Sequence, residues 1–418
     1  MTRDFVRPFD QLTVQDVPIV GGKNASLGEM IRALHGDGIR IPGGFATTAE
    51  AYRHLIDRAE LRGILEREIA ALHAGEAELH AVGQRIRHAF LHAELPGDLE
   101  DAIRAAYRAL GEEAGTTDLS VAVRSSATAE DLPSASFAGQ QETFLNVKGE
   151  RHLLDACRRC YASLFTDRAI SYREAQGFDH LEVALSIGVQ RMVRSDLASS
   201  GVMFTIDTET GFPDAVLIDA AWGLGETVVQ GIVDPDAYEV FKPLLDREDR
   251  TPILAKRLGA KESKMVYARG GTASTKLQDT THAERERFVL SDSEIVQLAR
   301  WAKRIEAHYG RPMDLEWAKD GETNELFILQ ARPETVQSQR EAAAMKTYTL
   351  RGDGGDPLVT GIAIGEAIVT GPVQVIERAD DIGRFEDGAI LVTGMTDPDW
   401  VPIMKRAAAI VTDHGGRT

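Results

Sequence analysis

Residues 121–147 read VAVRSSATAEDLPSASFAGQQETFLNV. The stretch opens and closes on β-like runs, and between them lies a loop rich in small and hydroxylated residues. Small residues let backbone amides crowd around a polyphosphate, and hydroxyl groups add hydrogen-bond donors. Arg124, at the end of the first run, presents a planar fork that grips a phosphate through two hydrogen bonds. A flexible surface loop is the alternative, but the flanking runs tether the loop at both ends, so the pattern favours phosphate binding.

A second segment, VGGKNASLGEM at residues 20–30, is also suited to a phosphate. Its apolar residues recur at helical spacing, and Asn24 or Ser26 is available as the N-cap. Gly21 and Gly22 precede Lys23 at this helix start, where backbone N–H groups and the helix dipole favour an anion. Lys23 adds a mobile positive charge. An exposed lysine after a turn is the alternative interpretation.

A third segment is a predicted strand pair, RPMDLEWAKD at 311–320 and LFILQARPE at 326–334. Alternate side chains of a strand share a face, so Asp314 lies with Glu316, and Gln330 lies with Arg332. If the strands pair, two carboxylates, an amide oxygen and a guanidinium converge on one patch. Hard oxygen ligands suit Mg²⁺, which takes one or two carboxylates plus substrate phosphates. A solvated strand face with cross-strand charge pairs is the alternative.

The familiar nucleotide-binding motifs are missing from the sequence. No stretch matches the P-loop motif GxxxxGK[ST], and none matches the metalloprotease motif HExxH or the hydrolase motif GxSxG. GLGETV at 223–228 begins like a dinucleotide fingerprint but lacks its third glycine. The three segments above therefore predict a Mg-nucleotide site that is built without a P-loop.

Composition narrows the class of protein. A chain of 418 residues predicts two to four domains, because single cores rarely exceed about 250–300 residues. The net charge of −18 argues against nucleic-acid or anionic-membrane binding, since both need a basic surface. No window holds the roughly 18 consecutive apolar residues of a membrane helix, and the start has no apolar signal-peptide region. The presence of only two cysteines fits a reducing cytoplasm, so we expect a cytoplasmic protein.

The two cysteines, Cys157 and Cys160, form a CxxC motif. A zinc site needs four ligands, and the sequence offers no second CxxC or HxxxH partner. The surrounding LLDACRRCYASLF has its apolar residues at helical spacing, with both cysteines in the stripe. We therefore expect the cysteines to pack on an amphipathic helix rather than to bind metal or do redox chemistry.

The predicted secondary structure changes along the chain. The first 120 residues are mostly helical in pattern, and residues 120–240 hold short β-like runs interrupted by a helix at 151–175. A capped helix is predicted at 291–309, beginning at Ser291 or Ser293. Residues 333–357 lose apolar periodicity, and we place a linker at 341–358. A second small unit follows, with predicted strands GIAIGEAIV, PVQVI, AILVT and AAIVT and a turn-helix DPDWVPIMKRA.

Six stretches closely resemble phosphoenolpyruvate synthases, of the phosphohistidine enzyme family that also holds pyruvate phosphate dikinase and rifampin phosphotransferase: VGGKNASLGEM, AVRSSATAEDLPSASFAGQQETFLNV, VQRMVRSDLASSGVMFTIDTETG, AWGLGETVVQG, RPMDLEWAKDG and LQARPETV. They occur in order along nearly the whole chain. The resemblance implies an α+β fold: an ATP-grasp nucleotide-binding domain of two subdomains at 1–340, then a β/α swivelling phosphohistidine domain at 359–418, incomplete here.

The resemblance also implies a role for individual residues. The expected triphosphate ligands are Lys23, Arg124 and Arg332. Gly139 and Thr143 match the glycine-rich loop that covers the phosphates, and Gln190 and Val193 match the strand that borders adenine. The expected Mg²⁺ ligands are Glu316 and Gln330, with Asp314 close by.

The implied reaction is ATP + pyruvate + water → AMP + phosphoenolpyruvate + phosphate, carried through a phosphohistidine. In the family motif this histidine stands two places past Thr418, so we expect no catalytic histidine in these residues. His414 precedes the glycines of VTDHGGRT and matches a variable position. The alternatives are an antibiotic phosphotransferase and an ATP-binding module without turnover, and the latter is expected of these 418 residues alone. The full-length enzyme is expected to be a homodimer.

Overall fold

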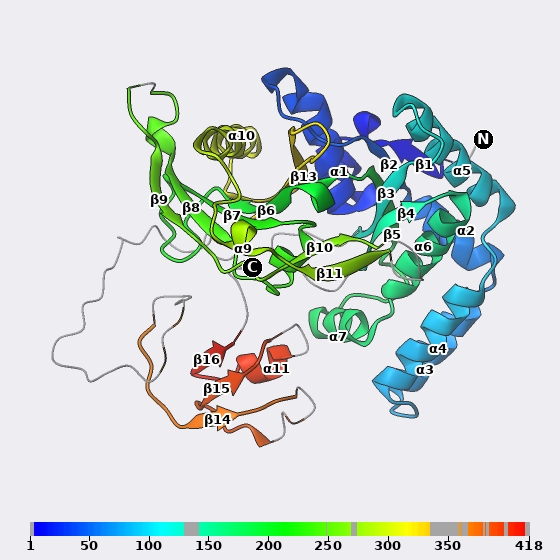
Figure 1. Ribbon diagram of the computed structural model, residues 1–418. Helices are drawn as coiled ribbons and strands as arrows, with labels where there is room; N and C mark the ends of the chain where they lie inside the picture. Colours follow the sequence, from blue (N-terminus) through cyan, green and yellow to red (C-terminus); the bar gives the residue numbers. More distant parts are fainter. Residues whose placement is uncertain are drawn as a thin grey trace. The chain divides into compact units, whose positions relative to one another are not determined.

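The computed structural model describes residues 4–128, 142–247, 249–268, 274–334, 359, 361, 367–378, 381, 384–396 and 400–413 (Figure 1). The chain is a mixed α/β protein with several sheets. It divides into two compact units, each made of several segments. Unit 1 comprises Met1–Arg194, Val266–Lys276 and Lys319–Arg332, and unit 2 comprises Ser195–Met265, Leu277–Ala318 and Pro333–Thr418.

Unit 1 contains a five-stranded sheet in the order β1-β2-β5-β3-β4, in which all neighbours are antiparallel. Its strands are β1 (Val6–Pro8), β2 (Gly44–Thr47), β3 (Ser120–Ala127), β4 (Thr143–Lys148) and β5 (Leu185–Arg191). The helices of this part of the chain are α1 (Val17–Leu34), α2 (Ala49–Arg58), α3 (Arg62–His73), α4 (Leu79–His92), α5 (Gly97–Glu113), α6 (Glu150–Ser163) and α7 (Asp167–Gln176). Short 3₁₀ turns occur at Phe9–Gln11, Val14–Asp16 and His35–Asp37.

The two faces of this sheet differ in chemistry. Side chains alternate along β3 and β5, so Val121, Val123, Ile187 and Val189 share one face. All four belong to the main apolar core, together with Leu153, Cys157 and Cys160 of α6. The opposite face carries smaller or polar residues and packs against α1. The polar face of the sheet is therefore the one that can present polar side chains to a ligand.

The predicted CxxC helix is confirmed. Both cysteines are fully buried as free thiols in α6, and the Cys160 thiol contacts the Val123 carbonyl oxygen of β3. Burial raises the pKa of Cys157 to about 12, and burial likewise raises the pKa of Cys160. These thiols therefore act as small apolar residues of the core.

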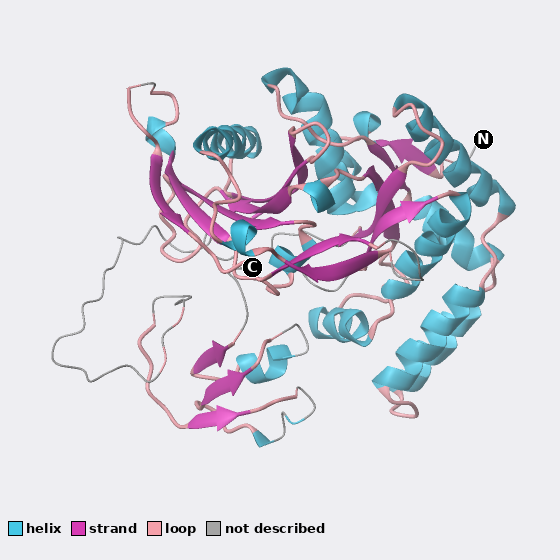
Figure 2. Ribbon diagram, in the orientation of Figure 1, coloured by secondary structure: helices cyan, strands magenta, loops and turns pink. Residues whose placement is uncertain are grey.

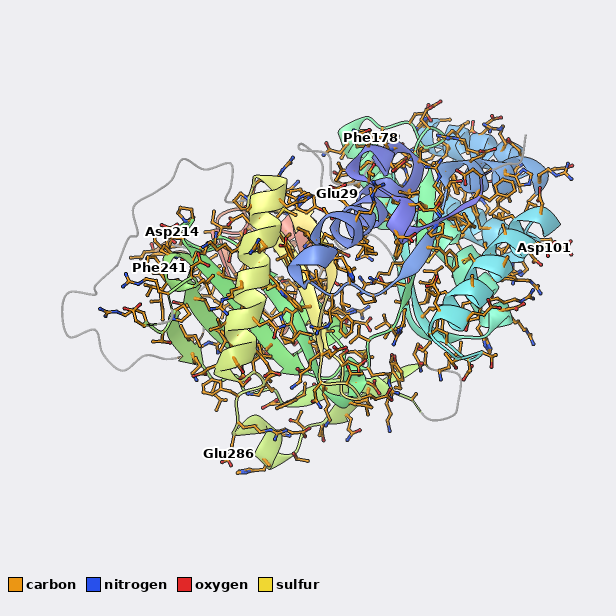
Figure 3. All side chains as sticks on the ribbon, turned by 90° about the horizontal axis from the view of Figure 1, so that it is seen from above. Glu29, Asp101, Phe178, Asp214, Phe241 and Glu286 are labelled. Carbon is orange, nitrogen blue, oxygen red and sulfur yellow. The ribbon has the colours of Figure 1, made fainter. Side chains whose placement is uncertain are left out.

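Unit 2 is built on a sheet whose strands lie in the order β12-β6-β7-β8-β9. The strands are β6 (Ser199–Phe204), β7 (Ala215–Trp222), β8 (Asp236–Phe241), β9 (Ile253–Arg257) and β12 (Met313–Lys319), whereas β13 (Leu326–Pro333) falls mostly within the residues of unit 1. In Figure 3, the labelled Asp214 and Phe241 mark where β7 begins and β8 ends. The remaining elements are the β10 (Ser263–Tyr267) and β11 (Thr275–Asp279) ribbon, α8 (Glu226–Val229), α9 (His282–Arg285), and 3₁₀ turns at Ser195–Leu197 and Lys242–Leu244.

The helix predicted at 291–309 is α10 (Asp292–Tyr309), which packs against β7, β8 and β9 (Figure 2). Ser291 is its N-cap and forms a capping box with Glu294, and Gly310 ends it with a left-handed backbone. Of the two serines considered from the sequence, the first is therefore the cap.

The last described part is a small parallel sheet, β14 (Val373–Val375), β15 (Ile390–Thr393) and β16 (Ala409–Thr412), with the short helix α11 (Val401–Met404). These elements confirm three predicted strands and the turn-helix. Residues 367–370, which overlap the end of the predicted strand GIAIGEAIV, have no regular structure, so the strand prediction is wrong there. The predicted linker at 341–358 and His414 lie outside the described residues.

No helix within the described ranges is both long and apolar enough to cross a membrane.

Candidate functional site

The register of β3 arranges residues of the candidate site in rows across the polar face. Arg124 lies opposite Gly188 of β5 on one side and Thr143 of β4 on the other. Two residues further along β5, Gln190 lies opposite Ala122 of β3. On the other side of β5, Gln190 lies opposite Gly44 of β2. Because most neighbours of Arg124 and Gln190 in these rows are small, the two long polar side chains have room above the sheet.

Helix α1 brings Lys23 to this face because the helix is broken at Gly21. The backbone there has φ 74° and ψ 165°, so a new helical segment begins just before Lys23. The predicted N-cap is wrong, because α1 already begins at Val17 and both Asn24 and Ser26 lie inside it. A Cβ atom at Gly21 would lie 2.3 Å from the Ser126 hydroxyl oxygen of β3. Only glycine therefore permits both the turn and the close approach of α1 to the sheet.

One cavity within unit 1 gathers the polar residues of these elements. Its lining comprises Phe9, Lys23, Asn24, Leu27, Arg124, Gly188, Gln190 and Gln330. Four residues predicted from the sequence, Lys23, Arg124, Gln190 and Gln330, thus meet in one place. The lining carries two cationic groups and three side-chain amides, and it includes no carboxylate. This composition favours an anionic ligand with additional hydrogen-bonding groups.

Backbone contacts hold the walls of the cavity. Ser26 of α1 donates through its hydroxyl to the Ala331 carbonyl oxygen at 2.9 Å, next to Gln330 on β13. The Gln190 amide nitrogen lies 3.5 Å from the carbonyl oxygens of Pro42 and Leu329. Both amide side chains of the sheet strands, Gln190 and Gln330, are buried. The cavity is therefore assembled from segments that are far apart in the sequence.

The remaining nucleotide residues predicted from the sequence do not line this cavity. Thr143 is exposed at the start of β4, in the same row as Arg124. Val193 is buried just after β5, and Arg332 is half-buried on β13. Gly139 lies outside the described residues. The roles of these four residues stay predictions.

The predicted alternation of MDLEW is confirmed. Met313, Leu315 and Trp317 of β12 are fully buried, whereas Asp314 and Glu316 are half-buried. Within unit 1, the turn between β12 and β13 is organised by Asp320, which accepts hydrogen bonds from the backbone N–H groups of Glu322 and Thr323 at 2.8 and 3.0 Å. The grouping of Glu316 with Gln330 around a metal stays a prediction.

Asn24 and Gly188 are among the cavity residues that the sequence reasoning missed. Both had a readable signal: Asn24 follows Lys23 directly, and Gly188 precedes Gln190 by two residues on a strand, hence on the same face. Asn24 was considered only as a helix cap. The structure instead buries its side chain between the helix and the sheet.

A cluster that the sequence did not indicate lies on the helical side of unit 1. Glu174 of α7 accepts hydrogen bonds from Nε2 of His73 at 2.8 Å and from Nε2 of His180 at 2.5 Å. The ligand atoms of these three residues are close enough to hold a metal ion. However, Arg173 donates through Nε to Nδ1 of His180 at 2.9 Å, which leaves the proton of neutral His180 on Nε2. Metal binding through Nε2 would displace that proton toward a nitrogen already facing a cation, so the cluster is best described as a hydrogen-bonded triad.

Comparison with known families matches most of the chain. The model of the AMP/ATP-binding domain of pyruvate phosphate dikinase matches residues 17–352, and that of the mobile domain of PEP-utilising enzymes matches residues 385–418. Similar curated proteins are the phosphoenolpyruvate synthases of Synechocystis sp. (55% identical, covering 98% of this chain and 51% of the relative), Pseudomonas aeruginosa (53%, 99% and 52%) and Escherichia coli (52%, 98% and 51%). The chain spans about half the length of these relatives.

Proposed function

This chain belongs to the pyruvate phosphate dikinase AMP/ATP-binding family, and from this membership we propose that it binds Mg-ATP as the nucleotide part of a phosphoenolpyruvate synthase. The observation that carries the proposal is the meeting of Lys23, Arg124, Gln190 and Gln330 around one cavity. The proposed fold is ATP-grasp. The proposed reaction of the complete enzyme converts ATP, pyruvate and water into AMP, phosphoenolpyruvate and phosphate.

Each polar group of the cavity has a part in this proposal. Lys23 and Arg124 neutralise the phosphate oxygens, Lys23 as a point charge and Arg124 as a fork that orients them. Gln190 supplies an amide from the sheet at the position that borders the adenine base. Arg332 is proposed to add a third cation on the phosphate chain, with Thr143 and Gly139 in the segment that covers it.

The donor set proposed for Mg²⁺ fits that ion. Glu316 and Asp314 offer carboxylate oxygens and Gln330 offers an amide oxygen, and all three are hard ligands of the kind Mg²⁺ takes beside phosphates. When bound, the ion offsets the charge that develops on the phosphate oxygens during transfer. The protein's own residues bind the nucleotide and orient it.

The similarity of the chain to several phosphoenolpyruvate synthases favours this reaction over antibiotic phosphorylation. The decisive test is calorimetric titration of the purified chain with Mg-ATP. We expect saturable binding to one site, and we expect Lys23→Ala to weaken it by about tenfold or more, because a charge-assisted contact contributes roughly 1.5–3 kcal/mol. Lys303→Ala is the matched control, since that lysine lies on α10 of unit 2 and pairs with the exposed Asp246.

Absence of Mg-ATP binding by the folded chain overturns the nucleotide proposal. The acceptor is tested separately with the complete enzyme, in which AMP formation is expected to depend on pyruvate. AMP formation that depends instead on an antibiotic favours the alternative.

A further inference from the structure

The Asn24 side chain joins α1 to the sheet immediately beside Lys23. Its Nδ2 atom donates to the Val20 carbonyl oxygen at 3.0 Å and to the Ser186 hydroxyl oxygen of β5 at 2.9 Å. Both amide hydrogens are therefore used, and the side chain is 2% exposed. Val20 lies before the Gly21 break and Asn24 after it, so one amide ties the two helical segments to each other and to the strand.

The partner of Asn24 is itself fixed by a buried network. The Ser186 hydroxyl donates to the Thr47 carbonyl oxygen of β2 at 2.5 Å. The Thr47 hydroxyl oxygen accepts from the Ile187 backbone N–H at 2.9 Å and from the Tyr161 hydroxyl of α6 at 3.2 Å. The side chains of Ser186, Thr47 and Tyr161 are all fully buried. Satisfied buried networks are rigid, so Asn24 is anchored on a fixed point of the core.

On its other side, the Asn24 side chain fits only because residue 188 is a glycine. A Cβ atom at Gly188 would lie 2.2 Å from Asn24 Oδ1. Gly188 is also the residue opposite Arg124 in the register. The space left by this glycine is therefore occupied by the Asn24 amide, which lines the cavity together with Lys23 and Arg124.

We propose that Asn24 is a positioning residue for nucleotide binding, which holds the start of the second α1 segment so that Lys23 meets the phosphate chain. Asn24 acts through Lys23 in this account. Alanine at position 24 removes both donors and frees the helix start to shift across the Gly21 break. Small displacements of a charged group weaken its contacts strongly. The inference rests on the proposed Mg-ATP function and adds a residue to it. In Figure 3, the labelled Glu29 marks the helix that carries Asn24.

The test is a double-mutant cycle on the whole chain, with Mg-ATP and AMP titrated by calorimetry. Asn24→Ala is expected to weaken Mg-ATP binding about tenfold, which corresponds to roughly 1.4 kcal/mol. AMP, which lacks the outer phosphates, is expected to lose less than about twofold. In a Lys23→Ala background, Asn24→Ala is expected to change Mg-ATP affinity by less than about twofold, because the residue through which it acts is gone.

A second variant tests the same proposal in case Asn24→Ala does not fold. Ser186→Ala removes the acceptor of Asn24 without changing any residue of the cavity lining, and it is expected to reproduce the selective loss for Mg-ATP at smaller size. Ser163→Ala is its control, because that buried serine donates to the Cys160 carbonyl oxygen and belongs to no part of this network.

The outcomes separate the two proposals. Equal losses for Mg-ATP and AMP, or an undiminished effect of Asn24→Ala in the Lys23→Ala background, overturn the positioning role. A folded wild-type chain that does not bind Mg-ATP overturns the proposed function instead.

Discussion

Arg124 of β3 and Gly188 of β5 lie directly opposite each other, and both line the cavity that contains Lys23. The cationic side chain thus stands next to a position without a side chain. The pair shows how the sheet accommodates Asn24 beside a cation: β3 supplies the charge, and β5 supplies the space that the Asn24 amide occupies. The first prediction concerns that space.

Gly188→Ala is expected to weaken Mg-ATP binding by about tenfold, while the protein stays folded. The new Cβ atom conflicts with Asn24 Oδ1, and Asn24 moves only if it gives up hydrogen bonds to Val20 or Ser186, each of which contributes about 1 kcal/mol. Calorimetry of Mg-ATP binding measures the effect. Gly63→Ala in α3 is the control, because nothing lies within 4 Å of the added methyl group. Unchanged affinity in Gly188→Ala would show that the space is not needed.

Glu316→Gln is expected to reduce the dependence of ATP affinity on Mg²⁺. The substitution keeps the size of the side chain but removes the charge that Mg²⁺ prefers in a ligand. ATP titrations with and without Mg²⁺ give the ratio that should fall. Glu239→Gln, an exposed position on β8 of the same sheet, should leave that ratio intact. An unaltered ratio in Glu316→Gln contradicts the metal assignment.

Stability is expected to fall as the pH drops from 7 to 5, with a contribution from His180. Burial lowers the pKa of His180, and the nearby Arg173 cation adds to this, although the hydrogen bond to Glu174 opposes it. The unfolded chain therefore binds more protons than the folded chain at pH values below about 6.5, so unfolding is favoured there. The pKa of Glu174 is lowered by its hydrogen bonds to His180 and His73, so that carboxylate stays ionised across this range.

Urea unfolding at several pH values measures this effect. His180→Gln should flatten the dependence between pH 5 and 7. His282→Gln is the control, because the His282 side chain is 85% exposed. A slope that His180→Gln leaves unchanged would assign the dependence to other groups.

Cys157 and Cys160 are expected to resist thiol reagents in the native chain at about pH 8. Burial raises the pKa of both thiols and blocks access to them, whereas the thiolate is the reactive form. A colourimetric disulfide reagent should titrate both thiols only after denaturation. Fast labelling of the folded chain would instead favour a redox role for the CxxC motif. Tight Zn²⁺ binding that protects the thiols would favour a metal site.

Much of the local structure was predictable because it depends on near neighbours in the sequence. The helix at 291–309 needed only apolar periodicity and a capping serine, and the alternation in MDLEW needed only the two-residue period of a strand. The helical segment that begins before Lys23 followed from the two glycines, whereas the preceding turn from Val17 was not predicted. The strand predicted for GIAIGEAIV failed at 367–369 because an apolar run becomes a strand only if a neighbouring strand pairs with it.

The sequence by itself determined which chemical groups to expect in the candidate site: Lys23, Arg124, Gln190 and Gln330 were identified from residue type, spacing and resemblance. Only the tertiary structure decided that these four share one cavity and that Asn24 and Gly188 complete it. The physical reason is that cross-strand register places Arg124 opposite Gly188, sixty-four positions along the chain. A buried amide such as Asn24 shows its role only through partners that the fold brings to it.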